Sequence, residues 1–503
     1  MAKSLNNRFS TRVRSVLSWF GLEREAAMAL TGVVSGSLLL SYVLVRTNGS
    51  IVSGVGLVTV MTVILLTLRR LDWGFYIFLG AVLISDNFAI PGFEPWTATL
   101  GYLITINSTR PGLPLGAFTP MELHLLFLIS LWIVTIAVRK DVQFHRIPGG
   151  IPAILFFLWL FASVAYGSMT GGDTNRALWQ IRSFLYLGIM FAFVPQIITR
   201  KDQIRNVLWV IIVTLGYKGW QAAKRYIDLG YSFGEYRALA AHEDPVLLVT
   251  VFLFLFCLIF FGGPAPQRRV ILLILLPLLL GFYAANRRAA YICLLISMIV
   301  LAVLVPDKVR ARVLTVLIVF GIFFGAYLAV YWNDEYGSKA QFAQAVKSAL
   351  TKDPKEMRPE DYYSGLARDQ ENYNLAVTLQ RLPLGLGFGK QHDWAIINFG
   401  SFSLKGYATH NEILWLLVTS GPVGFFFFFL FLNSILFSGS GILSRLRDPY
   451  LMAVCAMCII EIPNHIIHTY VDMGFTRARS MTYLGLLMGL ISVTVRAEET
   501  SGT

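Results

Sequence analysis

Long continuous apolar runs dominate this chain, and they predict helices that cross a membrane. A helix needs roughly 20 apolar residues to span a bilayer. The runs do not alternate between apolar and polar positions, and they contain much Leu, Phe and Ala, which favours helices over the strands of a barrel. The pattern predicts fourteen spans, near residues 27–45, 51–68, 73–85, 121–138, 151–166, 184–198, 204–217, 245–261, 270–285, 289–305, 313–331, 411–432, 449–464 and 480–495.

Composition supports the same fold class. Of the 503 residues, 56% are hydrophobic and 14% are charged, and the mean hydropathy is +0.63. This is too apolar for a soluble protein, so we expect an all-α polytopic membrane protein with one long, partly helical extracytoplasmic loop. The expected division is a cytoplasmic segment at 1–26, helices one to eleven in 27–331, the loop at 332–410, helices twelve to fourteen in 411–495, and a cytoplasmic tail at 496–503.

Basic residues set the predicted orientation. If the amino terminus is cytoplasmic, every predicted inside connection carries Lys or Arg, as the positive-inside rule requires. The formal charge of +13 is then largely a topology signal, and we expect no nucleic-acid partner. The basic start has no Ala-x-Ala cleavage pattern before the first long apolar run, so we expect an uncleaved anchor.

A second group of arginines is predicted at the opposite, outer ends of the spans. Arginine near a bilayer is costly unless an anion meets it, so this group suggests a site for a negatively charged substrate. Its members are Arg176, Arg182, Arg237, Arg287, Arg288, Arg368, Arg477 and Arg479.

The loop at 332–410 contains two predicted helices. Phe342, Val346 and Leu350 recur at helical spacing, which predicts an amphipathic helix that lies on the membrane surface or packs on the rest of the loop. A second helix is predicted over 369–382, and it should stop at Pro383. The glycine-rich segment that follows, residues 385–389, favours a plain turn over a phosphate-binding loop, because no Lys-Ser pair and helix follow it.

His410 stands where the long loop re-enters the membrane. A histidine there can exchange protons with water, and its ordinary pKa of about 6.5 suits a general base. Capping or packing is the commoner role for a histidine at the start of a helix. The neighbouring outer arginines favour the catalytic role here.

Cysteines and potential metal ligands give weaker signals. Cys257, Cys293 and the Cys-x-x-Cys at 455–458 fall inside predicted spans, which favours packed thiols over disulfides or a redox site. His465, His468 and Asp472 share one predicted helical face, and a polar helix end is the preferred interpretation over a zinc site. No Asp-x-Asp motif is present, so we expect metal-independent chemistry without a cofactor.

Three blocks of sequence resemble the superfamily of O-antigen ligases and O-antigen polymerases, which are integral-membrane glycosyltransferases. Asn-Arg-Arg-Ala-Ala-Tyr (286–291) is similar to its Ser-Arg-x-Ala block, and Arg368 followed by Pro-Leu-Gly-Leu-Gly (383–387) resembles its Arg and Pro-Leu-x-Gly-x-Gly segment. Thr-His-Asn-Glu with the later Gly-Pro-Val-Gly (409–424) resembles its His-Asn block. Arg237 lies in a partial match, where Val246 replaces the usual asparagine. The resemblance covers roughly residues 200–500.

This resemblance implies transfer of a glycan from a polyprenyl diphosphate carrier to an acceptor hydroxyl. Arg287 and Arg368 would clamp the diphosphate, and His410 would be the base in an inverting reaction. The further substrate-binding candidates are Arg237, Arg288, Asn411, Arg182 and Arg479. The implied partners are the carrier-linked glycan, a glycan or lipid-core acceptor, and membrane lipids. The implied location is the bacterial inner membrane, with the active site facing the periplasm.

Two alternatives to a ligase stay open. A polymerase would join one carrier-linked repeat unit to another, and it needs the same arginines and base. A transporter or flippase for lipid-linked sugars would favour charges near the membrane midplane and an internal repeat. The sequence shows charges clustered at predicted outer ends and no detectable repeat, so the glycosyltransferase is the preferred hypothesis.

Overall fold

The computed structural model contains helices as its regular elements throughout the described residues, apart from one isolated bridge between Lys405 and Ala408. The chain divides into two compact units, Met1–Ile77 and Phe78–Thr503. The structure describes residues 36–39, 41–42, 45, 51–86, 95–109, 117–138, 144–233, 236, 238–263, 266–334, 338–351, 353, 358–396 and 405–501. The expected cytoplasmic segment at 1–26 and most of the predicted span at 27–45 lie outside these residues.

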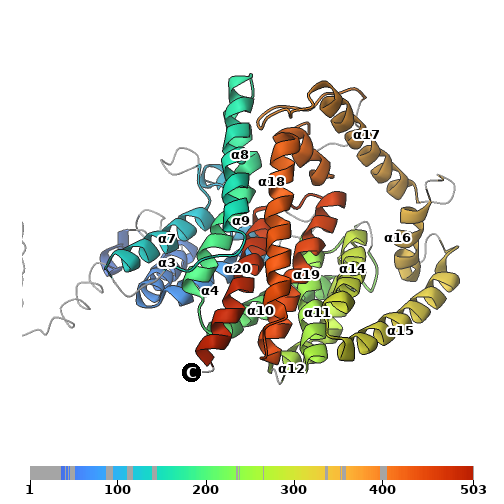
Figure 1. Cartoon of the computed structure of the whole chain (residues 1–503), viewed down its shortest axis with the longest axis horizontal. Coiled ribbons are helices and arrows are strands. Elements are labelled where there is room, and N and C mark those ends of the chain that lie inside the picture. Colours follow the sequence, from blue (N-terminus) through green and yellow to red (C-terminus); the bar gives the residue numbers. More distant parts are fainter. Residues whose placement is uncertain are drawn as a thin grey trace, which may run out of the picture. The chain divides into compact units, whose positions relative to one another are not determined.

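Helices cover every predicted span from residue 51 onward (Figure 1). In chain order they are α3 (Ile51–Arg69), α4 (Leu71–Ile84), α5 (Trp96–Thr99), α6 (Ile106–Thr109), α7 (Pro120–Val138), α8 (Gly150–Met169), α9 (Thr174–Ile197), α10 (Lys201–Asp228), α11 (Asp244–Phe261), α12 (Pro266–Leu273), α13 (Leu275–Ala284), α14 (Arg288–Leu304), α15 (Asp307–Tyr331), η1 (Ser338–Ala340), α16 (Gln341–Leu350), α17 (Pro359–Arg381), α18 (Glu412–Leu443), α19 (Pro449–Val471) and α20 (Ala478–Ser501).

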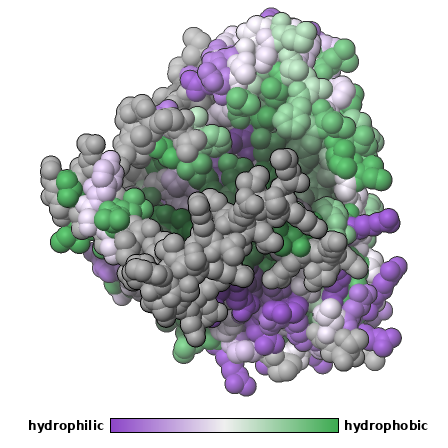
Figure 2. Space-filling model, turned by 90° about the vertical axis from the view of Figure 1, so that its left-hand side faces the viewer, coloured by the Kyte–Doolittle hydropathy of each residue, from purple (hydrophilic) through white to green (hydrophobic). Residues whose placement is uncertain are grey.

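The protein is a multi-pass membrane protein. Eight helices of the described residues are long and apolar enough to span a bilayer, and the bent pair α12–α13 is a ninth candidate. The eight are α7, α8, α9, α11, α15, α18, α19 and α20. Figure 2 shows exposed hydrophobic residues gathered over a broad area, with hydrophilic residues concentrated toward its ends. The predicted total of fourteen spans stays a prediction, because α3, α4, α10 and α14 do not meet the same length and composition test.

Two boundaries differ from the sequence prediction for physical reasons. The run predicted as one helix at 270–285 is broken at Ile274, and its halves meet at 57°. Pro277 in the first turn of α13 has no amide hydrogen to continue the preceding helix. The helix predicted over 369–382 begins earlier, at Pro359, where proline at the first position and two acidic residues after it favour a helix start.

Helix α19 is the centre of the second unit. It packs against α11, α14, α18 and α20, while α18 also packs on α8 and α20 on α9 (Figure 1). The four cysteine thiols are buried in α11, α14 and α19. Helices α15, α16 and α17 follow one another along one side of the unit. The start of α18 lies against α17, and this contact builds the site described next.

Candidate active site

The candidate site lies at the end of the bundle where α11, α14, α18 and α20 begin and α19 ends, which we call the site end. The side chain of Asp173 caps α9 by accepting amide hydrogens of Asn175 and Arg176, and that of Asn411 caps α18 by accepting from Leu414 at 3.1 Å. Both are residue types that favour this position. These N-caps fix where α9 and α18 begin and where the preceding polar loops of the site end finish.

His410 is held by a buried carboxylate of α17. Glu371 accepts the backbone amide of His410 at 2.9 Å, and its two oxygens lie 3.0 and 3.2 Å from His410 Nδ1. Because a carboxylate only accepts, Nδ1 carries the proton and Nε2 presents a lone pair. Burial alone lowers the pKa of His410, but the hydrogen bond and charge of Glu371 outweigh it, so the pKa is raised above its ordinary value. This arrangement suits a general base.

Arg368 lies near His410, and Arg287 lies near Arg368. Arg368 stands one helical turn before Glu371 on α17, and its charge acts on both His410 and Arg287. Neither guanidinium has a hydrogen bond or salt bridge among the described residues, and Arg287 Nε is buried without a partner. Burial and the neighbouring arginines lower the pKa of Arg287, although Asp472 opposes this. Two adjacent guanidinium groups without a salt-bridged carboxylate are prepared to meet an anion.

Arg288 has a different environment from Arg287. Its guanidinium pairs with Asp361 of α17 at 3.1 Å and donates to the hydroxyl of Ser348 on α16. Arg288 therefore ties the start of α14 to the segment between α15 and α18. The sequence alone did not decide which of the two arginines enters the site, and the contacts favour Arg287.

Asp472 and Arg477 complete the site end from the loop between α19 and α20. Burial would raise the pKa of Asp472, but the nearby His242, His468 and Arg287 hold it well below its ordinary range. His242 Nδ1 lies 3.6 Å from the Asp472 carboxylate. Arg477 also acts on Arg287, and it lies 3.9 Å from Glu243. Several arginines therefore gather at the site end, and Asp472 is an ionised acid among them.

The loop between α19 and α20 is anchored by Glu412, the first residue of α18. Its buried carboxylate accepts the backbone amide of Gly474 at 2.6 Å, those of Phe475 and Thr476, and the Thr476 hydroxyl. Charge-assisted hydrogen bonds of this kind are among the stronger ones in proteins. Glu412 therefore holds the loop between α19 and α20, which carries Arg477, against the start of α18. His410 lies just before that start.

The glycine-rich segment at 385–389 is a packed turn. Gly385, Gly387 and Gly389 have positive φ angles of 107°, 84° and 87°. The amides of Leu386 and Gly387 donate to carbonyls of Val418 and Thr419 at 2.8 and 3.0 Å, where α18 is kinked at Gly421 before Pro422. The amide of Gly389 donates to Gln180 at 2.6 Å. These amides already donate hydrogen bonds to acceptors within the protein, so they are not available to bind a phosphate. The expectation of a plain turn is confirmed.

The other sequence candidates take positions with internal partners. Arg182 of α9 pairs with Glu122 of α7 and donates to the carbonyl of Ala117 at 2.9 Å. Asn411 donates to Asn372 at 3.0 Å in addition to capping α18. No described contact joins Arg182 or Arg479 to His410, Arg287 or Arg368. Arg237 lies outside the described residues.

Arg479 belongs to a buried ion-pair network beneath the site end. It pairs with Asp244 at 2.6 Å and Glu243 at 3.0 Å, and it approaches Asp86 at 3.8 Å. Lys218 of α10 pairs with the same Asp86 and Asp244 at 2.6 and 3.2 Å. These fully paired charges hold the starts of α11 and α20 together, which favours a structural role for Arg479.

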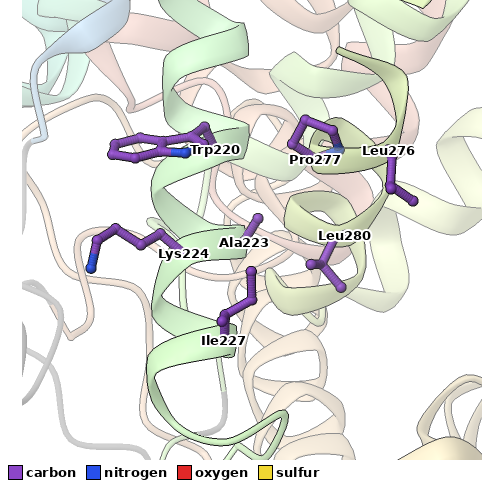
Figure 3. A pocket seen from close by; sticks show the side chains of 7 residues that line it. All are labelled: Trp220, Ala223, Lys224, Ile227, Leu276, Pro277 and Leu280. Carbon is purple, nitrogen blue, oxygen red and sulfur yellow. The ribbon is translucent and has the colours of Figure 1, made fainter. Parts of the chain in front are cut away.

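A cavity of about 400 Å³ lies between α10 and α13. Figure 3 shows its side chains running from Trp220 and Leu276 at one end to Ile227 and Leu280 at the other. The remaining lining residues are Ala223, Lys224 and Pro277, and Lys224 pairs with Asp228 at 2.5 Å. From Leu280, α13 continues to Ala284, and Arg287 follows three residues later, directly before α14. The lining of this groove is apolar apart from Lys224.

Sequence reasoning missed Glu371, Glu412 and the buried carboxylate partners of Arg479. Glu371 is 39 residues from His410, and no local spacing marks the pair. Glu412 stood in the recognised Thr-His-Asn-Glu block, but its partners lie 62 to 64 residues away. Comparison of the sequence with models of known protein families and with curated proteins gives no significant match.

Proposed function

We propose that the protein is a membrane glycosyltransferase of the O-antigen ligase type. It transfers a glycan from a polyprenyl diphosphate carrier to an acceptor hydroxyl, of a lipid core or a similar glycan, on the periplasmic side of a bacterial inner membrane. The observation that carries the proposal is the Glu371–His410 pair beside Arg287 and Arg368, two arginines without salt-bridge partners in the described residues. A base next to a diphosphate clamp is what this reaction needs.

In the proposed reaction, His410 Nε2 takes the proton of the acceptor hydroxyl. The acceptor oxygen forms a bond to the anomeric carbon as the bond from that carbon to the diphosphate oxygen breaks, and the diphosphate leaves with the electron pair. Arg287 and Arg368 stabilise the charge that grows on the leaving group. Glu371 keeps the Nδ1 proton in place and stabilises the imidazolium. Attack opposite the leaving group inverts the anomeric carbon.

The groove between α10 and α13 supports a lipid-linked donor. Its lining is apolar except for Lys224, and side chains such as Trp220 and Leu276 are exposed, as a binding surface for a lipid tail requires. A polyprenyl chain in this groove would bring its diphosphate toward Arg287. The proposal therefore assigns the tail to the groove and the charged head to the arginines, without a metal ion in either role.

The test of the proposed function is a transfer assay with purified protein in detergent. The donor is a polyprenyl diphosphate oligosaccharide, and the acceptor is either a lipid core or a second copy of the donor. Glycan on the lipid core supports a ligase, and lengthened carrier-linked chains make the protein a polymerase instead. Absence of both products, together with carrier flipping in liposomes that contain the protein, would contradict the glycosyltransferase and favour a transporter.

Replacement of Glu371 by glutamine should move the pH dependence of transfer. His410 acts as a base only above its pKa, and Glu371 raises that pKa. Without the carboxylate, burial dominates and lowers the pKa, so the acid limb of the rate profile should shift to lower pH. The maximal rate should fall about tenfold or more, because the imidazole loses its fixed tautomer. The measurement is the rate between pH 5 and 9 for the wild type and the variant.

The control for this prediction is Asp393→Asn. Asp393 is a carboxylate of the same segment, and it pairs with Arg381 at 3.1 Å. The Asp393→Asn variant should show the same dependence of transfer rate on pH as the wild type. An unshifted acid limb in the Glu371 variant would mean that another group is the base.

A further inference from the structure

A stripe of polar side chains runs along one face of α19. Glu461, His465, His468 and Asp472 follow at intervals of four, three and four residues, which places them in line along the helix. The first three lie inside a candidate membrane span and are 0%, 2% and 2% exposed. Ionisable residues are costly at such positions, and each one suggests a functional site.

The hydrogen bonds around Glu461 fix which atoms donate. Asn464 Nδ2 donates to Glu461 Oε2 at 2.7 Å, so its amide oxygen faces away from that bond. His465 Nδ1 lies 3.0 Å from the backbone carbonyl of Glu461. Because a carbonyl only accepts, Nδ1 carries the proton and Nε2 keeps a lone pair.

Three acceptors are then left without a donor. Glu461 Oε1, Asn464 Oδ1 and His465 Nε2 are buried and make no hydrogen bond within the described residues. Buried polar atoms almost always have a partner, so three such acceptors on neighbouring residues require an explanation. All three offer electron pairs, and a cation or a proton is the kind of ligand that they would accept.

Hydroxyl groups from the surrounding helices converge on the same place. Thr250 of α11 lies beside Glu461 without forming a regular hydrogen bond. The ring of Tyr483 on α20 is 6.3 Å from that of His465. The Cys293 thiol of α14 donates to the backbone carbonyl of Asn464 at 3.5 Å, and Ser297 is one turn further along α14. The Ser297 hydroxyl has no partner within the described residues. The Tyr483 hydroxyl lies beside Thr250 without forming a regular hydrogen bond.

The carboxylate of Glu461 has no basic counterion. No Lys or Arg pairs with it in the described part of the chain, and the nearest salt-bridge contact is His465 Nδ1 at 3.6 Å. The other titratable groups that interact electrostatically with Glu461 are Cys257 on α11, Cys293 on α14, Cys458 on α19 and Tyr483 on α20. None of these brings positive charge, so a charged Glu461 needs a cation from outside the chain.

We propose that Glu461, Asn464 and His465 form a binding site for one monovalent cation, a proton or Na⁺, between α11, α14, α19 and α20. One carboxylate matches one positive charge, and amide and hydroxyl oxygens are ligands of hard cations. A proton would sit on Glu461 Oε1 and turn that atom into a donor to the neighbouring acceptors. This site is independent of the proposed glycosyltransferase function.

The stripe connects this cation site to the site end. His468 is the next side chain along it, and its Nδ1 has no hydrogen-bond partner in the described residues. The charged groups that act on His468 are Asp472 directly after its own helix, Glu243 before α11, Arg477 in the loop after α19 and Arg287 before α14. Protonatable groups therefore follow one another from the middle of α19 to the arginines.

The test compares the purified wild-type protein in detergent with Glu461→Gln. A bound proton predicts an infrared band of a protonated carboxyl group at pH 7 that is present in the wild type and lost in the variant. Bound Na⁺ predicts that replacing choline chloride by sodium chloride at equal ionic strength raises the wild-type Tm by about 3 °C or more, with no rise in the variant. Either result supports the site and identifies its ligand.

The proposal would be overturned if the wild type and the variant have the same carboxyl band and Na⁺ does not raise the Tm of the wild type. That result would indicate that bound water donates to these acceptors. The glutamine variant should fold, because its amide NH₂ supplies a permanent donor to these acceptors. Asn464→Leu is a second variant that should weaken the Na⁺ response or shift the band. Glu498→Gln is the control, since Glu498 only accepts amides of Arg447 and Asp448 at the opposite end of α20.

Discussion

Substitution of His410 by alanine should reduce glycan transfer by about 10²- to 10⁴-fold, the usual contribution of a general base. The imidazole is held by Glu371 through Nδ1, and its side chain is one-third exposed, so Nε2 is available to an acceptor hydroxyl. Donor binding should change little, because the diphosphate is assigned to Arg287 and Arg368. The measurement is kcat and KM for the donor in the purified protein.

His392→Ala is the matched control for this prediction. His392 is a buried histidine of the same segment, and its Nδ1 lies 3.0 Å from the carbonyl of Asp393. Nothing in the described contacts links it to the arginines. The His392→Ala variant should have a lower free energy of unfolding, whereas its kcat should stay close to that of the wild type. Equal loss of kcat in both variants, or normal kcat without His410, would show that His410 is not the base.

Replacement of Arg479 by methionine should destabilise the protein by about 3 to 5 kcal/mol, the usual cost of breaking a buried ion pair from one side. Arg479 is 2% exposed, and it pairs with Glu243 and Asp244. Without it, Lys218 still pairs with Asp86 and Asp244. The only basic partner that Glu243 keeps among the described residues is the more distant Arg477, at 3.9 Å. The measurement is thermal or denaturant unfolding of the purified protein in detergent.

Arg200→Met provides the comparison. Arg200 pairs with Asp202 at 3.1 Å, but both side chains are more than half exposed. Such a pair contributes about 0 to 1 kcal/mol, so the variant should unfold close to the wild type. A stable Arg479 variant that has lost donor binding would reverse our assignment and place Arg479 in the substrate site.

The helices of this protein could be predicted from the sequence because apolar runs are local signals. α11 and α18 begin within one residue of the predicted starts, at Asp244 and Glu412. The bend at Ile274 was missed because the apolar run continues through it. α10 extends past its predicted end at residue 217 because tertiary partners satisfy its later polar residues, as Asp86 does for Lys218.

The candidate site was only partly predictable. His410, Arg287 and Arg368 could be selected from short motifs, and the structure places Arg368 within electrostatic reach of both His410 and Arg287. Their surroundings depend on contacts between distant segments, such as Glu371 with His410, and no spacing rule encodes these. The same limit applied to Arg479, because its carboxylate partners come from residues more than 230 positions away.

In the proposed reaction, Arg287 and Arg368 hold a lipid diphosphate beside His410. The most direct measurement is the Kd of polyprenyl diphosphate for the wild type, Arg287→Ala and Arg288→Ala in detergent, with uncharged polyprenol as the reference ligand. Loss of a charge-assisted contact predicts a Kd about 10- to 150-fold higher for Arg287→Ala and a smaller change for Arg288→Ala. Equal affinity for diphosphate and polyprenol, or an unchanged Kd without Arg287, would contradict the account.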